Sequence, residues 1–168
     1  MAENDKKPSD IDSRSNEPLQ KDEKVTGSEN EADSHEVVST RTAKVWLDAD
    51  GIIHKEFHEH AEETLKDALE SMEVIKRISK GRKLPIMIDM GKVHSMDPEA
   101  RAYYSGNEAF SATSAAAAVT KSLMSRLIGN FFLGFNKPEY PRKVFSNESE
   151  ALDWLKDFLS SQHKQHKE

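Results

Sequence analysis

The stretch Leu84-Pro85-Ile86-Met87-Ile88-Asp89-Met90 decides the fold, because it is a short and nearly continuous apolar run. Runs without polar alternation are typical of strands that are covered on both faces, as in a parallel sheet flanked by helices. Proline cannot donate a hydrogen bond to a sheet ladder, so Pro85 fits this strand only near its beginning or beside an open edge. The run therefore predicts a buried strand within an α/β domain.

Upstream of this strand, the sequence predicts a hairpin and then a helix. Residues 42–47 and 52–57 are apolar-rich runs joined by Asp48-Ala49-Asp50-Gly51, which are turn-forming residue types. Thr64 and Asp67 have the spacing of a capping-box variant, which marks the start of a helix. Apolar residues then recur at helical spacing until Gly81, a residue type suited to the end of a helix.

Downstream of the same strand, helices and strands alternate. Asp97-Pro98-Glu99 has the order of residue types that begins a helix. The alanine-rich run 115–120 predicts a buried strand, 122–135 a strongly apolar helix and 142–145 a last short strand, before a capped helix begins at 147–150. Alternation that follows a hairpin predicts an α/β fold with a mixed, mainly parallel sheet and right-handed crossovers.

The charge of the chain is concentrated at its beginning. The formal net charge of the 168 residues is −6, and residues 1–40 alone hold eleven acidic and five basic residues, so the remainder is neutral. This segment has almost no large apolar side chains with which to offset the entropy of ordering. We expect a disordered acidic tail over 1–40, one domain over 41–162 and a charged C-terminal extension over 163–168. A neutral domain behind an acidic tail is a poor candidate for nucleic-acid binding, which depends on basic side chains.

Several classes of protein are disfavoured by what the sequence lacks. Without cysteine there is no disulfide framework, thiolate zinc site or cysteine nucleophile. The first ten residues are charged and have no apolar core of a secretory signal. No apolar run approaches the roughly 20 residues that span a bilayer. We expect a cytoplasmic protein without stable membrane insertion.

The element order across residues 42–160, together with the segment from Ile86 to Glu99, resembles the STAS domain of sulfate transporters and anti-sigma-factor antagonists. It is also similar to the SpoIIAA-like and SEC14-like relatives of that fold. The resemblance implies a bacterial, STAS-like regulatory domain. In the antagonists, a Met-Asp-Ser-Ser-Gly turn opens a helix and its second serine is phosphorylated. Met96 and Asp97 match that turn here, whereas Pro98, Glu99 and Ala100 replace the serines and the glycine. The phosphoserine therefore does not carry over, and Glu99 supplies a permanent charge in its place.

Six polar residues on and after the buried strand predict a partner-binding surface, because partners tend to meet α/β sheets at the carboxyl ends of strands. They are Asp89, His94, Ser95, Asp97, Glu99 and Arg101. The structural alternative is that Asp97 caps a helix and that Asp89 or Asp97 forms an ion pair with Arg101. Ser95 is also a candidate phosphorylation site, since a phosphate is electrostatically favoured near a helix N-terminus.

Two further candidates depend on spacing. Arg126 and Asn130 lie four residues apart, on one helix face, where they could form an anion or ligand pocket or serve only the structure. The helix 122–135 that carries them has more apolar surface than one sheet contact covers, which favours a homodimer interface over a lipid groove. His58 and His60 would share one face of a strand, but two histidines without a third ligand are usually solvated. We expect neither a metal nor a cofactor.

No motif for catalysis is present: the sequence has no GxSxG elbow, P-loop, GxGxxG turn or HExxH pair. His94, Ser95 and Asp97 have the residue types of a catalytic triad, but a triad is defined by geometry and not by composition. We therefore expect a non-enzymatic regulatory module that docks to a protein partner. The alternative is a small-ligand or lipid carrier of the SEC14-like type, and a hydrolase is less favoured.

Overall fold

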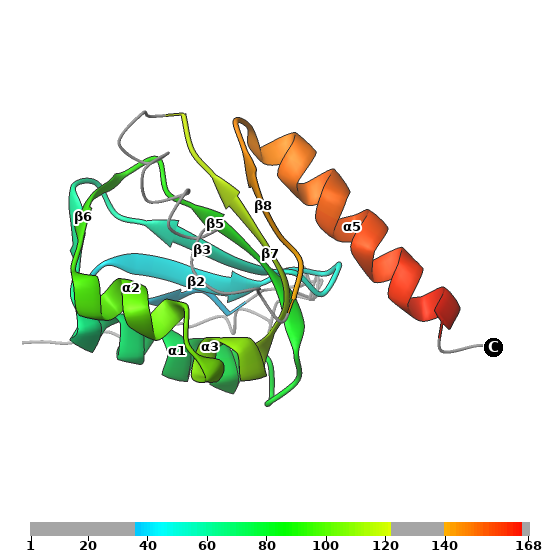
Figure 1. Cartoon of the computed structure of the whole chain (residues 1–168), viewed down its shortest axis with the longest axis horizontal. Coiled ribbons are helices and arrows are strands. Elements are labelled where there is room, and N and C mark those ends of the chain that lie inside the picture. Colours follow the sequence, from blue (N-terminus) through cyan, green and yellow to red (C-terminus); the bar gives the residue numbers. More distant parts are fainter. Residues whose placement is uncertain (1–35, 122–139, 166–168) are drawn as a thin grey trace, which may run out of the picture. The chain divides into compact units, whose positions relative to one another are not determined.

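The computed structural model describes residues 36–121 and 140–165, which belong to one compact unit. Its main sheet has the strand order β1–β2–β3–β5–β7–β8 (Figure 1). The strands are β1 Val38–Ser39, β2 Ala43–Leu47, β3 Ile53–Phe57, β5 Leu84–Asp89, β7 Thr113–Val119 and β8 Arg142–Phe145. The first pairs are antiparallel, and every pair from β3 to β8 is parallel. The predicted α/β fold with a hairpin leading into a mainly parallel sheet is confirmed.

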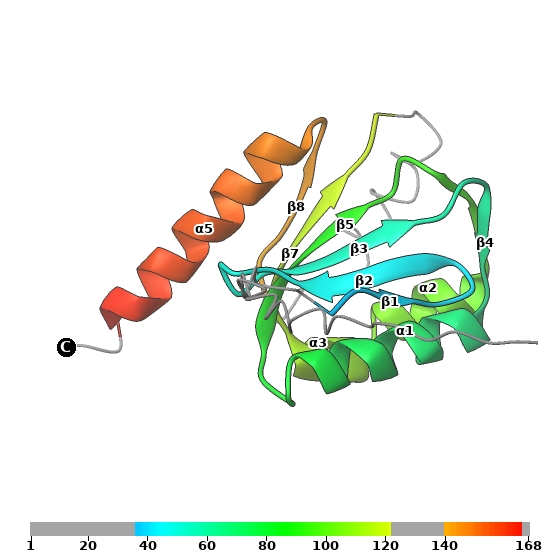
Figure 2. The same cartoon turned by 180° about the vertical axis from the view of Figure 1, so that it is seen from behind.

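Helices cover both faces of this sheet, as Figures 1 and 2 show from opposite sides. On one face lie α1 Leu65–Ile78, α2 Pro98–Tyr104 and α3 Asn107–Ala112, and on the other lies α5 Glu148–Gln165. Alternate residues of β5 point to opposite faces of the sheet, since Ile86 packs in the core with α1 and Met87 packs in the core with α5. This double burial explains why the sequence of β5 is a continuous apolar run. Within the described ranges, no helix combines the length and apolar character needed to cross a membrane.

Two strands carry the features that their sequences predicted. Pro85 is buried near the beginning of β5, where the register with β7 shifts and before the pairing with β3 begins at Ile86. Its missing donor therefore interrupts no regular ladder. In β7, all of the alanines from 115 to 118 are fully buried between the two helical layers. Burial on both faces makes this alanine run a strand, although alanine alone favours a helix.

The start of α1 is held by side chains on both sides of the cap. Thr64 and Asp67 form the predicted capping box, in which each side chain bonds to the backbone of the other residue. Asp67 is buried and also accepts two hydrogen bonds from the guanidinium of Arg41, at 2.7 and 2.5 Å. At the other end, Lys80 and Gly81 both have positive φ, 53° and 73°. The predicted glycine is thus part of the helix end, one residue beyond the first left-handed position.

The sequence analysis did not predict four features of the fold. The short strands β4 Ala61–Glu63 and β6 Val93–Met96 form a separate two-stranded parallel sheet. Each has only one or two apolar residues, which pack against Phe57, so neither shows a clear alternation. The strand β1 lies in the segment assigned to the tail, and α5 continues into the segment assigned to the C-terminal extension. The helix α3 was also missed, and the helix predicted over 122–135 lies outside the described residues.

Candidate functional site

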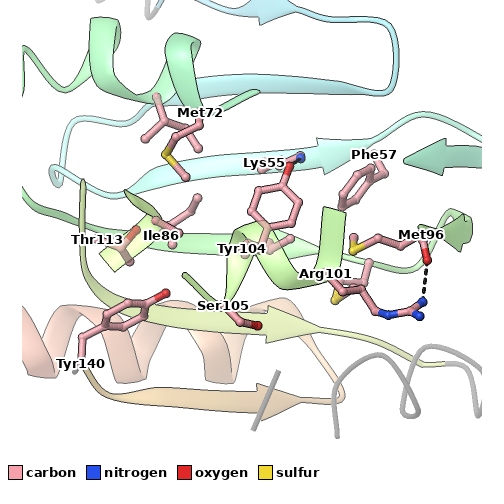
Figure 3. Close-up of a pocket in the computed structure, with 14 residues that line it drawn as sticks. Lys55, Phe57, Met72, Ile86, Met96, Arg101, Tyr104, Ser105, Thr113 and Tyr140 are labelled. Carbon is pink, nitrogen blue, oxygen red and sulfur yellow. Dashed lines mark hydrogen bonds between the residues drawn. The ribbon is translucent and has the colours of Figure 1, made fainter. Parts of the chain in front are cut away.

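A cavity lies between the sheet and the layer formed by α1, α2 and α3 (Figure 3). The cavity has a volume of about 50 Å³. This exceeds the roughly 10–15 Å³ that one water needs, yet it suits only a slender group. The described residues that line it are mostly apolar and come from both layers: Lys55, Phe57, Met72, Ile75, Ile86, Ile88, Met90, Met96, Arg101, Tyr104, Ser105, Ala109, Thr113 and Tyr140.

One member of a buried ion pair, Lys55, lines the cavity. The Lys55 ammonium donates to Glu63 Oε1 at 2.7 Å and to Tyr104 Oη at 2.6 Å, and the Tyr104 hydroxyl donates to the same Glu63 oxygen at 2.6 Å. Lys55 is only 3% exposed and Glu63 only 1%. The ammonium also lies 4.4 Å from the centre of the Phe57 ring. One carboxylate, one hydroxyl and an aromatic face therefore offset the cost of burying the lysine charge.

Strand alternation and a short connection bring these residues together. Ile53, Lys55 and Phe57 share one face of β3, so a lysine stands between two buried apolar side chains on the side of α1 and α2. Glu63 ends β4, directly before the cap of α1. Tyr104 is the last residue of α2. The network thus ties the centre of the main sheet to the small sheet and to α2.

Burial governs the electrostatics of the network. Desolvation lowers the pKa of Lys55, although the charge of Glu63 opposes this shift. Burial, followed by the negative charge of Glu63, raises the pKa of Tyr104 well above its ordinary value. The Tyr104 hydroxyl therefore keeps its proton, with which it donates the hydrogen bond to Glu63. Glu63 Oε2 is buried and has no hydrogen-bond partner in the described part of the chain.

The six residues predicted as a partner surface lie on three neighbouring elements, and we call them the β6–α2 surface: Asp89 at the end of β5, His94 and Ser95 on β6, and Asp97, Glu99 and Arg101 at the start of α2. Four of them, His94, Ser95, Asp97 and Glu99, are exposed. Among residues 36–121 and 140–165, the side chains of these four form no hydrogen bond or ion pair. Asp97 is the N-cap residue of α2, as the sequence predicted, but its side chain makes no capping hydrogen bond.

The remaining two residues of the β6–α2 surface have internal contacts. Asp89 Oδ1 accepts from the backbone N–H of Gly91 at 2.8 Å. Arg101 lines the cavity, and its guanidinium donates to the carbonyl oxygen of Met96 at 2.5 Å. Arg101 therefore belongs to both the surface and the cavity, whereas Asp89 satisfies its need for a partner within its own turn.

The other candidates have different outcomes. Arg126 and Asn130 lie outside the described residues. His58 and His60 lie in a turn between β3 and β4, where His60 has a φ of 56°, so the strand geometry expected for them is wrong. In the described part of the chain, no three or more histidine, aspartate or glutamate side chains are arranged to hold a metal ion.

A family model described as a domain of unknown function, DUF7793, matches residues 45–159. The chain belongs to this family. The match spans β2 to α5 and so includes both the cavity and the β6–α2 surface. A comparison with functionally curated proteins found no match.

Two solved structures are similar to this DUF7793 chain. One is an uncharacterized protein of the DUF3478 family from Shewanella loihica PV-4, described as having a SpoIIAA-like fold, with 12% identity and a TM-score of 0.47 over 73% of this chain and 92% of that chain. The other is a protein of unknown function from Arthrobacter sp. FB24, with 26% identity and a TM-score of 0.27 over 70% of this chain and 95% of that chain. The SpoIIAA-like resemblance inferred from the sequence agrees with the description of the first structure and concerns the fold alone.

Sequence reasoning missed the buried network of the DUF7793 domain. Lys55 stands in the run Ile53-His54-Lys55-Glu56-Phe57, which offers three consecutive polar residues. The available signal was the period of two, which places Lys55 between Ile53 and Phe57 on one face. No spacing in the sequence pairs Lys55 with Glu63 or Tyr104, because the three meet only through the packing of separate elements.

Proposed function

We propose that this chain is a non-enzymatic regulatory module that docks to a protein partner through the β6–α2 surface. The supporting observation is that the backbone of this surface is held by hydrogen bonds, whereas four of its polar side chains are exposed and have no partner among the described residues. The backbone of β6 pairs with β4, and the N–H of Asp97 donates to the carbonyl oxygen of Glu63 at 2.9 Å. The side chains of His94, Ser95, Asp97 and Glu99 point to solvent from this fixed frame.

Inward-facing residues hold the β6–α2 surface in place. Val93 and Met96 pack against the cluster around Phe57, and Ala100 is fully buried. Some exposed or half-buried acids elsewhere on the domain have internal partners, as Glu56 has Lys92 at 2.7 Å and Glu108 has Lys76 at 3.0 Å. Asp97 and Glu99 have no such partner within the described ranges, so they are available to a basic group of another protein.

Glu99 gives the β6–α2 surface a constant negative charge. It lies in the first turn of α2, where the helix dipole favours a carboxylate by about 0.3–1 kcal/mol. A carboxylate has less charge and fewer acceptor oxygens than a phosphoserine, so it imitates only part of a phosphorylated state. In the proposed docking, Glu99 carries a permanent negative charge, whereas related domains use a reversible phosphorylation. The docking takes place in the bacterial cytoplasm.

Reversing the charge of Glu99 tests the docking proposal. The full chain, tagged and expressed in its own cells, is captured with its partners and quantified by mass spectrometry. Glu99→Lys is expected to reduce recovery of a specific partner by about tenfold or more, because a repulsive contact replaces an attractive one. Glu70→Lys is the matched control, since Glu70 is exposed on α1 and makes the same change of charge away from the surface. Equal recovery with both variants would refute the proposed surface.

A further inference from the structure

Among the described residues, two charged side chains line the cavity, and both already have partners within the chain. Lys55 pairs with Glu63 and also donates to Tyr104. Arg101 donates to the carbonyl oxygen of Met96 and has at least one more interaction. An anion beside Lys55 would be repelled by Glu63, whose Oε2 is buried without a hydrogen-bond partner within residues 36–121 and 140–165. A cation would be repelled by Lys55 and Arg101. Because burying an unpaired charge is costly, the cavity favours a neutral ligand.

The rest of the described wall is neutral. Most of its side chains are apolar, and the polar ones carry hydroxyl groups only. Burial raises the pKa of Tyr104 and of Tyr140, so both phenols keep their protons near neutral pH. Ser105 is half-buried, and its hydroxyl forms no hydrogen bond to another described residue. The cavity therefore combines an apolar body with one hydroxyl that can both donate and accept a hydrogen bond.

The size and outline of the cavity restrict the ligand to a short chain. Its volume of about 50 Å³ is roughly four times the space that one water needs. Water requires two to four polar partners, whereas apolar cavities stay dry and accept apolar molecules. Figure 3 shows Phe57 and Met96 toward one end of the cavity, with Thr113 and Tyr140 toward the other. An elongated space of this size suits a chain of about four non-hydrogen atoms rather than a ring.

We infer that the cavity binds a short, unbranched and uncharged alcohol. Its hydrocarbon chain lies along Met72, Ile86 and Ile88, and its hydroxyl forms a hydrogen bond with Ser105. A ligand of this class leaves the ion pair of Lys55 intact and brings no charge into the buried site. The inference is independent of docking at the β6–α2 surface.

Titration of the full chain with 1-butanol, followed by methyl NMR, tests the inference. Butanol is expected to shift the signals of Met72, Ile86 and Ile88, which line the cavity. The signal of Ile52 is the matched control, since Ile52 is fully buried in the core on the opposite face of the sheet. The absence of butanol binding would overturn the inference, as would shifts at Ile52 without shifts at the three cavity residues.

Two charged analogues and one substitution test the chemical class of the ligand. Sodium butyrate and butylammonium have the chain length of butanol, and each is expected to bind at least about tenfold more weakly, because its charge finds no partner in the cavity. Ser105→Ala is expected to weaken butanol binding by about fivefold, the effect of one neutral hydrogen bond, and to leave the binding of 1-chlorobutane unchanged. Equal or tighter binding of either ion would refute a neutral site, and unchanged butanol binding in Ser105→Ala would refute an alcohol.

A filling variant adds an independent test of the position. Ala109 is a buried residue of α3 that lines the cavity, so Ala109→Leu places an apolar side chain in the space of the ligand. We expect this variant to weaken butanol binding by at least about tenfold, whereas Ala102→Leu, at an exposed position of α2, leaves it unchanged. Unchanged binding in folded Ala109→Leu would refute the placement, and the methyl shifts of the unmodified chain decide it if that variant does not fold.

Discussion

Replacing Glu63 by glutamine is expected to lower the free energy of unfolding by about 3–5 kcal/mol. The substitution keeps the size of the side chain but removes the carboxylate that, among the described residues, pairs with Lys55, whose ammonium lies 2.7 Å away and whose side chain is 3% exposed. The folded state must then hold an uncompensated buried charge or release a proton from Lys55. Equilibrium unfolding in urea, with the slope compared between variants, measures the loss.

The same strand provides a matched control for this prediction. Glu56, next to Lys55, pairs with Lys92 at the same distance of 2.7 Å, but both side chains are more than one third exposed. Water solvates this pair, so Glu56→Gln is expected to change stability by less than about 1 kcal/mol. Equal losses in Glu56→Gln and Glu63→Gln would show that burial does not determine the contribution of the Lys55 pair.

Removing both partners separates the role of the charge from the role of packing. The double variant Lys55→Met, Glu63→Leu buries apolar side chains of similar size and leaves no isolated charge. Its loss of stability is expected to be smaller than that of Glu63→Gln alone, since apolar replacements of buried ion pairs are often neutral. Losses that simply add would mean that the two side chains contribute independently.

The elements that the sequence predicted are those whose apolar residues follow one regular period. The hairpin, α1, β5, β7 and α5 each bury several side chains at a spacing of 2 or 3.6 residues, or along a continuous run. The strands β4 and β6 bury so few apolar side chains that no period can appear, and they form because each can pair with the other beside Phe57. Their existence depends on a long-range contact, which a local pattern does not contain.

The candidate site divides in the same way. The β6–α2 surface could be located from the sequence, because the end of a buried strand and a helix start are local signals. The Lys55 network could not, since polar residues in a strand usually indicate solvent and their partners come from β4 and α2. Buried charges are rare, so sequence reasoning assigns them to the surface by default. For this reason Lys55, which lines the cavity, was not predicted from the sequence.

The capping region of α1 provides the second large expected effect. Asp67 accepts from Arg41 Nε at 2.7 Å and from the backbone N–H of Thr64 at 2.9 Å, and it is 2% exposed. These hydrogen bonds to a charged acceptor predict that Asp67→Asn lowers stability by about 2 kcal/mol at pH 7. Glu70→Gln is the control, because Glu70 is an exposed acid on the same helix.

The same substitution should change how stability depends on pH. The Arg41 guanidinium, followed by the hydroxyl and N–H of Thr64, holds the pKa of Asp67 well below its usual range. A carboxylate whose pKa is lower in the folded state stabilises that state above its unfolded pKa of about 3.9 and loses this contribution as pH falls toward the folded value. The stability of the wild-type chain should therefore fall between about pH 5 and pH 3, and Asp67→Asn should fall less steeply over that range. Urea unfolding at several pH values measures both slopes, and parallel curves would mean that Arg41 does not stabilise the ionised form of Asp67 in solution.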